Sequence, residues 1–190
     1  MIFYIMGKSA SGKDSLYKKI LSSNLNLDRF AIYTTRPKRD GEVDGVEYYF
    51  VDKKYLDDNK DKIIEQRVYN TVFGDWYYAT LDDGKILKDK NYIAIGTLES
   101  YNNIKKYFGE EQVFPIYIEV SDEIRRERAI RRENHQKVPK FDEMERRLKA
   151  DEIDFSEEKL KEANIVKRYN ITELEDCFKE VAEDIKKFKV

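Results

Sequence analysis

A glycine-framed segment directly after the first apolar run constrains the fold of this chain most. The run Ile2–Met6 has the length of a buried strand and leads into GKSASGKDS at positions 7–15, and a helical pattern covers 14–22. The two glycines let backbone N–H groups turn inward toward phosphate oxygens, and the helix N-terminus adds a favourable dipole. Lys13 supplies positive charge for the outer phosphates. We therefore predict a nucleotide phosphate-binding loop formed by Gly7, Ser9, Ala10, Ser11, Gly12, Lys13, Asp14 and Ser15.

Apolar runs of strand type alternate with helical patterns along the rest of the chain. Strands are expected at 30–34, 92–95, 113–120 and 165–167, and helices at 98–108, 122–133, 142–162 and 172–188. This alternation predicts an α/β fold with a parallel sheet and helices on both faces. We expect one domain over 1–190, with a core of 1–36 and 81–190 and a small β-rich lobe inserted over about 37–80.

The charge of the chain is balanced overall but clustered locally. It has 36 Lys and Arg against 38 Asp and Glu, which excludes a histone-like basic protein and an acidic tail. Seven of the twelve arginines lie within one stretch, namely Arg125, Arg126, Arg128, Arg131, Arg132, Arg146 and Arg147. A near-zero net charge can therefore conceal a strongly positive site.

The cysteine and histidine content and the apolar segments indicate the compartment. One cysteine and one histidine cannot form an internal disulfide or a structural zinc site, and Cys177 lies on an apolar helical stripe typical of a core. No window approaches the ~18 apolar residues of a membrane span, and the N-terminal run lacks the features of a signal peptide. We expect a cytoplasmic protein.

A second cluster of charged and aromatic side chains follows the second expected strand. Positions 33–50 read YTTRPKRDGEVDGVEYYF, with three basic residues before a glycine-bounded turn and an aromatic strand after it. Arginine suits a phosphate dianion, because its forked donors bind two oxygens at once. Taken alone, a solvated charged loop explains the pattern equally well.

Together with the phosphate-binding loop, the segment TTRPKRDGEVDGVEYYF resembles the guanylate kinase family. The resemblance extends to Ile64-Glu65, Tyr77-Tyr78-Ala79-Thr80 and Arg146-Arg147-Leu148, and so covers nearly the whole chain. It implies a P-loop NTPase-type sheet with an acceptor-binding lobe and a short lid over about 125–147. It also implies ATP-dependent phosphorylation of GMP or dGMP to GDP or dGDP, with Mg²⁺ beside the ATP.

Six positions match the acceptor-binding motifs of the family. The resemblance assigns the acceptor phosphate to Arg36, Arg39, Tyr48 and Tyr78, and the base to Glu65 and Thr80. A carboxylate can accept hydrogen bonds from both N1–H and the exocyclic amine of guanine, while a hydroxyl donates to O6. Adenine lacks that donor pair and would leave a buried carboxylate unpaired, which gives strong discrimination.

The arginine-rich segment resembles the family's lid. Arg128, Arg132 and Arg147 match the lid arginines, and with Lys13 they form the implied catalytic set. Such residues would place positive charge over the phosphoryl group during its transfer. Arg131 takes the place of Arg132 if the register of the loop shifts. The alternative interpretation is an exposed charged helix that pairs with nearby glutamates.

The acidic residues near the metal depart from the family pattern. Ala94 and Gly96 stand where the family has aspartates near the metal and the acceptor. Mg²⁺ prefers oxygen ligands, so Asp14 and Ser15 are the candidate ligands, with Glu99 as a further source of negative charge.

Two further departures concern the acceptor. The spacing from Glu65 to Thr80 is longer than usual and includes Arg67, so the base pocket is expected to have a different lining. Ile32 replaces a small hydroxyl residue that would help to hold the acceptor phosphate.

These departures leave two alternatives to a guanylate kinase. One is a kinase of the same fold that acts on another or a modified nucleotide, and the other is a binding module without turnover. Retention of Lys13 favours an enzyme.

ATP and a nucleoside monophosphate are the expected partners, without nucleic acid or membrane, because no nucleic-acid-binding module is recognised. The pattern does not indicate an oligomeric state.

Overall fold

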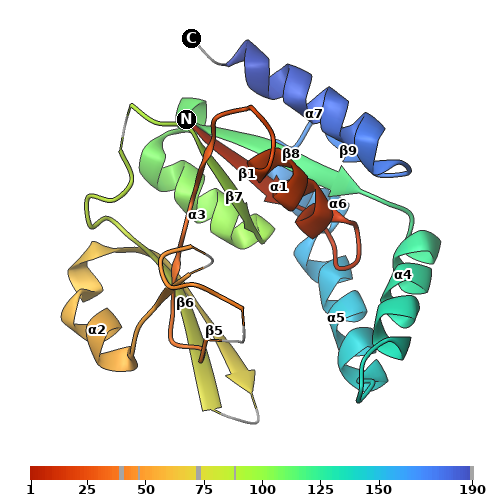
Figure 1. The fold of residues 1–190 in the computed structure, drawn as a ribbon, viewed down its shortest axis with the longest axis horizontal. Helices are drawn as coiled ribbons and strands as arrows, with labels where there is room; N and C mark the ends of the chain where they lie inside the picture. The colour runs from red at the N-terminus through yellow and green to blue at the C-terminus, as the bar shows by residue number, and fades with distance from the viewer. Residues whose placement is uncertain (39–40, 47, 72–73, 88, 189–190) are drawn as a thin grey trace.

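The computed structural model describes residues 1–38, 41–46, 48–71, 74–87 and 89–188 (Figure 1). The described elements are, in chain order, β1 (Ile2–Met6), α1 (Lys13–Leu21), β2 (Asp28–Arg29), β3 (Tyr33–Thr34), β4 (Tyr49–Phe50), α2 (Lys53–Asp58), η1 (Lys60–Lys62), β5 (Ile63–Thr71), β6 (Gly74–Leu81), β7 (Tyr92–Gly96), α3 (Leu98–Phe108), η2 (Glu110–Gln112), β8 (Val113–Glu119), α4 (Asp122–Asn134), α5 (Phe141–Asp154), α6 (Glu157–Glu162), β9 (Arg168–Asn170) and α7 (Leu174–Lys187).

Strand β1 lies at the centre of a parallel sheet with the strand order β2-β7-β1-β8-β9. Its successive side chains point to opposite faces, and each face is covered. Phe3 and Ile5 pack in a cluster with α1 and α7, whereas Tyr4 and Met6 pack in a cluster with α3 and α6. The predicted parallel sheet with helices on both faces is therefore confirmed. Cys177 is a buried member of the first cluster.

The strand order places a switch point at the carboxyl end of β1. Its neighbours β7 and β8 lie on either side, with Ile5 opposite Ile95 in one and Ile116 in the other. Ligands of open parallel sheets bind outside the carboxyl ends of the strands at such a point. The glycine-framed loop follows β1 there.

A second, smaller sheet has the order β4-β3-β6-β5. Strands β5 and β6 form a long antiparallel hairpin in which Glu65 lies opposite Thr80 and Arg67 lies opposite Tyr78. This sheet also includes β3, so it uses residues on both sides of position 37. In Figure 1 the hairpin and α2 extend below the core on one side, and α4 and α5 extend below it on the other.

The predicted strand at 30–34 is wrong as a single element. Only Tyr33 and Thr34 form a strand there, β3, which pairs with β6, whereas the strand that pairs with β7 is β2, before the predicted range at Asp28–Arg29. Phe30 lies between β2 and β3, where its ring packs on Tyr92 and its N–H donates to the Ile93 carbonyl. An apolar run alone does not reveal that its two ends pair with different partners.

The predicted helix at 142–162 is likewise two helices, α5 and α6. The buried ring of Phe155 stacks on Tyr117 at the break, and Ser156 caps α6 by accepting from the Lys159 N–H. The strand predicted at 165–167 lies three residues later, as β9. Arg168 is its first paired residue, opposite Tyr117.

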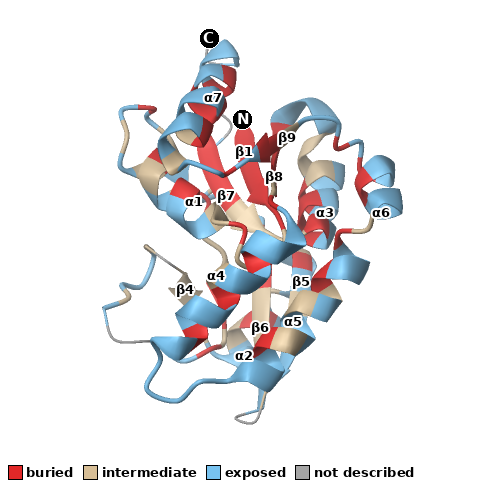
Figure 2. Cartoon of the chain, turned by 90° about the vertical axis from the view of Figure 1, so that its right-hand side faces the viewer, coloured by how far each residue is buried: buried red, intermediate tan, exposed pale blue. Residues whose placement is uncertain are grey.

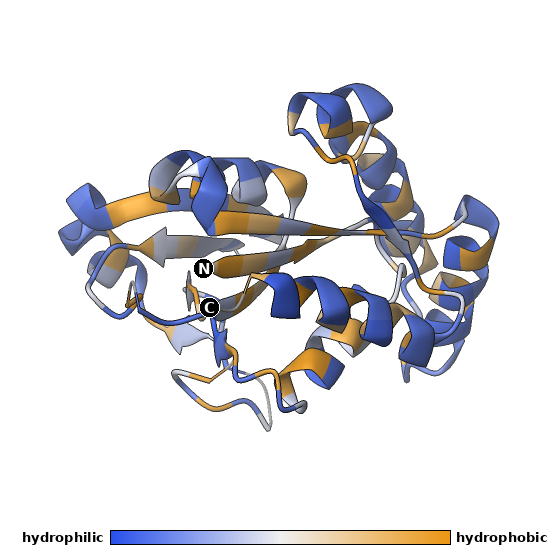
Figure 3. Ribbon diagram, turned by 90° about the horizontal axis from the view of Figure 1, so that it is seen from above, coloured by the Kyte–Doolittle hydropathy of each residue, from blue (hydrophilic) through white to orange (hydrophobic). Residues whose placement is uncertain are grey.

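Buried residues concentrate in the strands of the parallel sheet, whereas α4 and α5 are mostly exposed (Figure 2). Figure 3 shows the same division in hydropathy, with apolar strands between helices whose outer faces are hydrophilic. Within the described ranges, no helix is long and apolar enough to cross a membrane.

Asp184 of α7 fastens this helix to the sheet and makes stability depend on pH. Its carboxylate accepts hydrogen bonds from three side chains, Tyr169, Lys167 and Lys187. Burial by itself raises the pKa of this carboxyl, but the hydrogen bonds outweigh it and lower the pKa to about 2. We expect Asp184→Asn to lower the free energy of unfolding at pH 7 by about 1 to 2 kcal/mol.

Because the pKa is lower in the folded chain, this stabilisation is complete above the unfolded pKa of about 3.9 and is lost as pH falls through about 2. Urea unfolding of wild type and variant at pH 7, 4 and 2.5 measures it, with exposed Glu183→Gln as the control. An equal loss at all three pH values would assign the effect to packing instead.

Candidate active site

The loop between β1 and α1 has a backbone that glycine alone fits at its first position. Gly7 has a φ of 155°, and a Cβ there would lie 2.5 Å from the Ile118 carbonyl oxygen. Gly12 caps α1 with a left-handed φ of 96°, and Ala10 is also left-handed at 61°. The loop therefore wraps tightly between the central strand and the first helix.

A buried arginine clamps this loop from α4. Arg125 Nε donates to the Ser9 carbonyl at 3.0 Å, and Arg125 Nη2 donates to Asp151 Oδ2 at 2.9 Å. The same Asp151 oxygen accepts from the Ser9 N–H at 2.7 Å, so both backbone groups of Ser9 are held. Arg125 also pairs with Asp122 and Glu152, and its side chain is 2% exposed.

The sequence interpretation missed both sides of this clamp. Arg125 was part of the predicted positive cluster, yet it is buried in ion pairs rather than open to a ligand. Asp151 was not singled out at all. Its spacing of four residues from Arg147 on one helix was the available signal, because it places both side chains on the same face.

The predicted catalytic residues occupy two different environments. Arg128 donates to two backbone carbonyls, those of Ser11 at 3.3 Å and Ile171 at 3.0 Å, and so lies against the loop. Arg132 and Arg147 have exposed side chains on α4 and α5. Lys13 is half-buried at the start of α1.

The pKa of Lys13 reports the charges around it. Burial lowers the pKa of Lys13, the negative charges of Asp14 and Asp151 oppose that effect, and the positive charges of Arg147 and Arg132 lower it further. The structure thus brings Lys13, Arg132 and Arg147 into one electrostatic environment. Ser11 Oγ is buried nearby with no hydrogen-bond partner in the described part of the chain.

The candidate metal ligands lie in the first turn of α1. Asp14 and Ser15 are both exposed there, beside the loop. Among the described residues no group of three His, Cys, Asp or Glu side chains could hold a metal ion. At Gly96, a Cβ would collide with the hydroxyl of Tyr4, so a side chain of the neighbouring strand β1 occupies the space beside this glycine.

The predicted phosphate-binding residues of the small lobe gather around Arg36. Its buried guanidinium donates to both carboxylate oxygens of Glu42, at 2.8 and 2.6 Å, and stacks over the ring of Tyr48 at 5.1 Å. These hydrogen bonds raise the pKa of Arg36. Tyr48 in turn contacts the ring of Tyr78 edge-on at 5.7 Å. Arg39 lies outside the described residues.

Glu42 was not predicted, and it holds the arginine in the geometry that a phosphate would use. A carboxylate and a phosphate both offer two oxygens to the guanidinium fork. Glu42 engages one N–H on each Nη of Arg36, and the guanidinium has five N–H donors in all.

The predicted base-reading residues meet across the β5–β6 hairpin. Thr80 Oγ1 donates to Glu65 Oε1 at 3.0 Å, and both residues are buried. Glu65 Oε2 lies 3.2 Å from Arg67 Nε, although neither atom forms a hydrogen bond with any described residue. The sequence prediction includes Arg67 only as a residue within the longer spacing from Glu65 to Thr80, without a role of its own.

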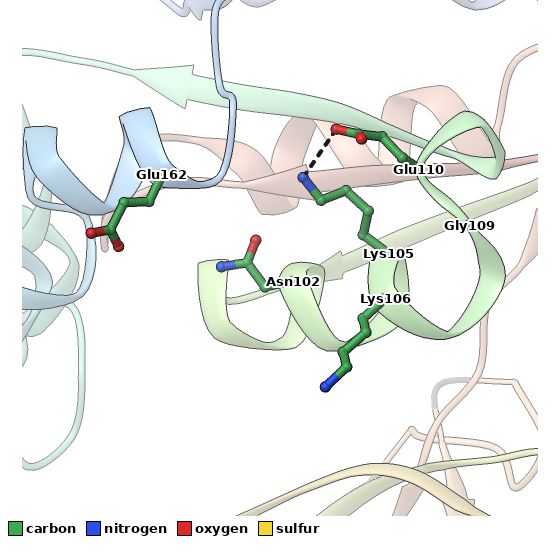
Figure 4. Close-up of a pocket in the computed structure, with 6 residues that line it drawn as sticks. All are labelled: Asn102, Lys105, Lys106, Gly109, Glu110 and Glu162. Carbon is green, nitrogen blue, oxygen red and sulfur yellow. Dashed lines mark hydrogen bonds and ion pairs between the residues drawn. The ribbon is translucent and has the colours of Figure 1, made fainter.

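A separate hollow of about 410 Å³ lies between α3, η2 and α6 (Figure 4). None of the predicted site residues lines it. Lys105 crosses it to donate to the Ala163 carbonyl at 3.0 Å and to Glu110 at 3.5 Å. The hollow thus contains a contact between helices, away from the loop after β1.

Comparisons with known proteins agree with these features. The family model for guanylate kinase matches residues 2–187. The guanylate kinase of Helicobacter hepaticus is 30% identical over 141 residues, which are 70% of this chain and 66% of that protein. That of Chlorobium chlorochromatii is 33% identical over 110 residues, 55% of this chain and 56% of that protein. The chain therefore matches between half and two thirds of the length of these curated relatives.

A solved structure shows the same fold. The crystal structure of guanylate kinase from Anaplasma phagocytophilum superimposes with a TM-score of 0.65 and 21% identity, covering 100% of this chain and 87% of that one. At this identity the likeness concerns the fold alone. Because the family model matches almost from end to end, the chain belongs to the guanylate kinase family.

Proposed function

We propose that this protein transfers the γ-phosphoryl group of ATP to GMP or dGMP. The observation that carries the proposal is the buried Glu65 carboxylate, which has one oxygen held by Thr80 and the other 3.2 Å from Arg67 Nε, an ion pair without a hydrogen bond among the described residues. Guanine offers N1–H and an exocyclic amine to such a group. A buried acceptor that lacks a hydrogen bond is costly, so a ligand that supplies one is favoured.

The proposed roles follow the chemistry of phosphoryl transfer, which needs alignment and positive charge more than covalent help. The loop at 7–15 would hold the phosphates of ATP, with Lys13 at the outer ones. Arg36, Arg39, Tyr48 and Tyr78 would hold the acceptor phosphate, with Glu42 orienting the guanidinium of Arg36. The remaining catalytic set, Arg128, Arg132 and Arg147, would offset the charge that develops between the two substrates.

Mg²⁺ fits the proposed site with few ligands from the protein. It is commonly bound through one or two oxygen side chains together with substrate phosphates. The exposed first turn of α1 offers such a set, the carboxylate of Asp14 and the hydroxyl of Ser15. When bound, Mg²⁺ would neutralise phosphate charge.

We expect the reaction in the cytoplasm, in keeping with a single buried thiol that needs no oxidising compartment.

ADP release over a panel of nucleoside monophosphates tests the proposal. Turnover on GMP and dGMP, but not on AMP, CMP or UMP, is the expected result. Preference for another acceptor would instead support a kinase of the same fold with different specificity, an alternative motivated by the longer spacing from Glu65 to Thr80. Tight GMP binding without turnover on any acceptor would support a binding module.

Glu65→Gln tests the base-reading role. We expect the ratio of kcat/KM for GMP to that for AMP to fall on the order of 10²-fold, because the glutamine amide offers a donor where guanine needs an acceptor. Steady-state kinetics on both nucleotides measures the ratio. Exposed Glu158→Gln is the matched control. An unchanged GMP to AMP ratio would remove Glu65 from base recognition.

A further inference from the structure

The base end of the small lobe contains a hydrogen-bond acceptor and a donor side by side. Glu65 Oε2 and Arg67 Nε lie 3.2 Å apart, and each is buried without a hydrogen bond within the described ranges. The side chain of Glu65 is 0% exposed and that of Arg67 is 14% exposed. The two groups form an ion pair, but neither atom completes a hydrogen bond, and buried polar groups in proteins nearly always do, so the couple points to a ligand that hydrogen-bonds to both.

Thr80 is already committed to Glu65. A threonine hydroxyl has one hydrogen to donate, and Thr80 donates it to Glu65 Oε1 at 3.0 Å. While that bond persists, Thr80 cannot also donate to a keto oxygen of the base. Another group must supply that hydrogen, and Arg67 Nε is the unused donor next to the carboxylate.

The edge of a 6-oxopurine complements this couple. It presents N1–H as a donor directly beside O6 as an acceptor, so the carboxylate oxygen can take the former while the guanidinium donates to the latter. Adenine reverses the pattern, with an acceptor at N1 and a donor at the 6-amine. The N1 acceptor of adenine would therefore face the carboxylate acceptor of Glu65, and its 6-amine donor would face the donor of Arg67.

The surroundings place Arg67 within the acceptor region. It lies opposite Tyr78 in the hairpin, and Tyr78 contacts the rings of Tyr48 and Tyr69. Tyr48 reaches Arg36 at the phosphate end. Glu65 Oε2 and Arg67 Nε are both covered by protein in this structure, so binding includes rotation of side chains, a common change at ligand sites.

We propose that Arg67 is a specificity-determining residue that donates a hydrogen bond to the 6-oxo oxygen of the acceptor base, while Glu65 accepts from N1–H. The proposal rests on the proposed function and names a residue outside the matched acceptor motifs. Thr80 is then a positioning residue that orients the Glu65 carboxylate.

The nucleotide 6-thio-GMP isolates this bond, because it keeps N1–H and the exocyclic amine but replaces O6 by sulfur, a weak acceptor. Affinities of GMP and 6-thio-GMP are measured by calorimetry without ATP, and kcat/KM with ATP. Wild type is expected to prefer GMP by roughly 10- to 100-fold, the effect of one hydrogen bond from a charged donor. Arg67→Met should weaken GMP binding by a similar factor and leave the two nucleotides nearly equal.

Thr80→Val is the matched variant and preserves shape. It is expected to weaken both nucleotides while retaining the preference for GMP. Collapse of that preference in Thr80→Val, or its survival in Arg67→Met, would overturn the assignment of Arg67. Equal affinities in wild type would overturn it without any variant, so a poorly folding Arg67→Met does not prevent the test.

These measurements distinguish a failure of the proposed function from a failure of the role assigned to Arg67. Wild type that turns over no GMP contradicts the proposed function, whereas wild type that turns over GMP with a preference independent of Arg67 contradicts this inference alone.

Discussion

Arg125→Met is expected to lower the free energy of unfolding by about 3 to 5 kcal/mol, the cost of removing one partner from a buried ion pair. The methionine would leave Asp151 beside the loop without its cation and would leave the Ser9 carbonyl without its donor. Urea unfolding followed by circular dichroism measures the loss.

Arg126→Met provides the control, because Arg126 is the next residue on α4 but has an exposed side chain paired with Glu145. An exposed pair contributes about 0 to 1 kcal/mol, so this variant should be close to wild type. Equal destabilisation by the two substitutions would show that Arg125 contributes only as a helix surface residue.

Lys13→Met is expected to lower kcat/KM for GMP phosphorylation on the order of 10²- to 10³-fold, because it removes a preorganised charge from the reacting phosphates. The folded state should lose little stability. Burial lowers the pKa of Lys13, which means that the protonated ammonium is held there at a cost that methionine does not have.

Coupled ADP-release kinetics and thermal unfolding measure these two effects of Lys13→Met. Exposed Lys18→Met on the same helix is the control for a general loss of positive charge. Wild-type turnover in Lys13→Met would remove this lysine from the proposed reaction.

The elements that sequence predicted well are those fixed by local pattern. The run Ile2–Met6 is the strand predicted, and the glycine spacing places the loop before α1 as expected. A buried strand followed by Gly7 leaves few alternatives, because both the hydrophobicity and the backbone conformation are local properties.

The elements that sequence predicted poorly depend on distant partners. Whether Phe30 and Tyr33 belong to one strand depends on the hydrogen bond of Phe30 to Ile93 in β7 and on the pairing of Tyr33 with β6, more than forty residues away in the chain. The break between α5 and α6 depends on the packing of Phe155 against Tyr117. A helical pattern running through 142–162 contains neither piece of information.

The same distinction applies to the site. The sequence singled out Glu65 and Thr80, which the hairpin register places opposite each other. It did not separate the arginines by role, because charge spacing on α4 cannot show that Arg125 turns inward to Ser9 while Arg132 stays exposed. Nor could it show that Arg67 lies against the unpaired oxygen of Glu65.

The contact between Tyr4 and Gly96 restricts the order in which this chain can change. An aspartate cannot be introduced at position 96 while the Tyr4 hydroxyl occupies the space of its Cβ. A smaller residue at position 4 must come first, and that change by itself opens a void in the core cluster that contains Tyr4. Each single step is thus unfavourable, and the effect of either substitution depends on the other. Positions 4 and 96, on two neighbouring strands, thereby form an epistatic pair.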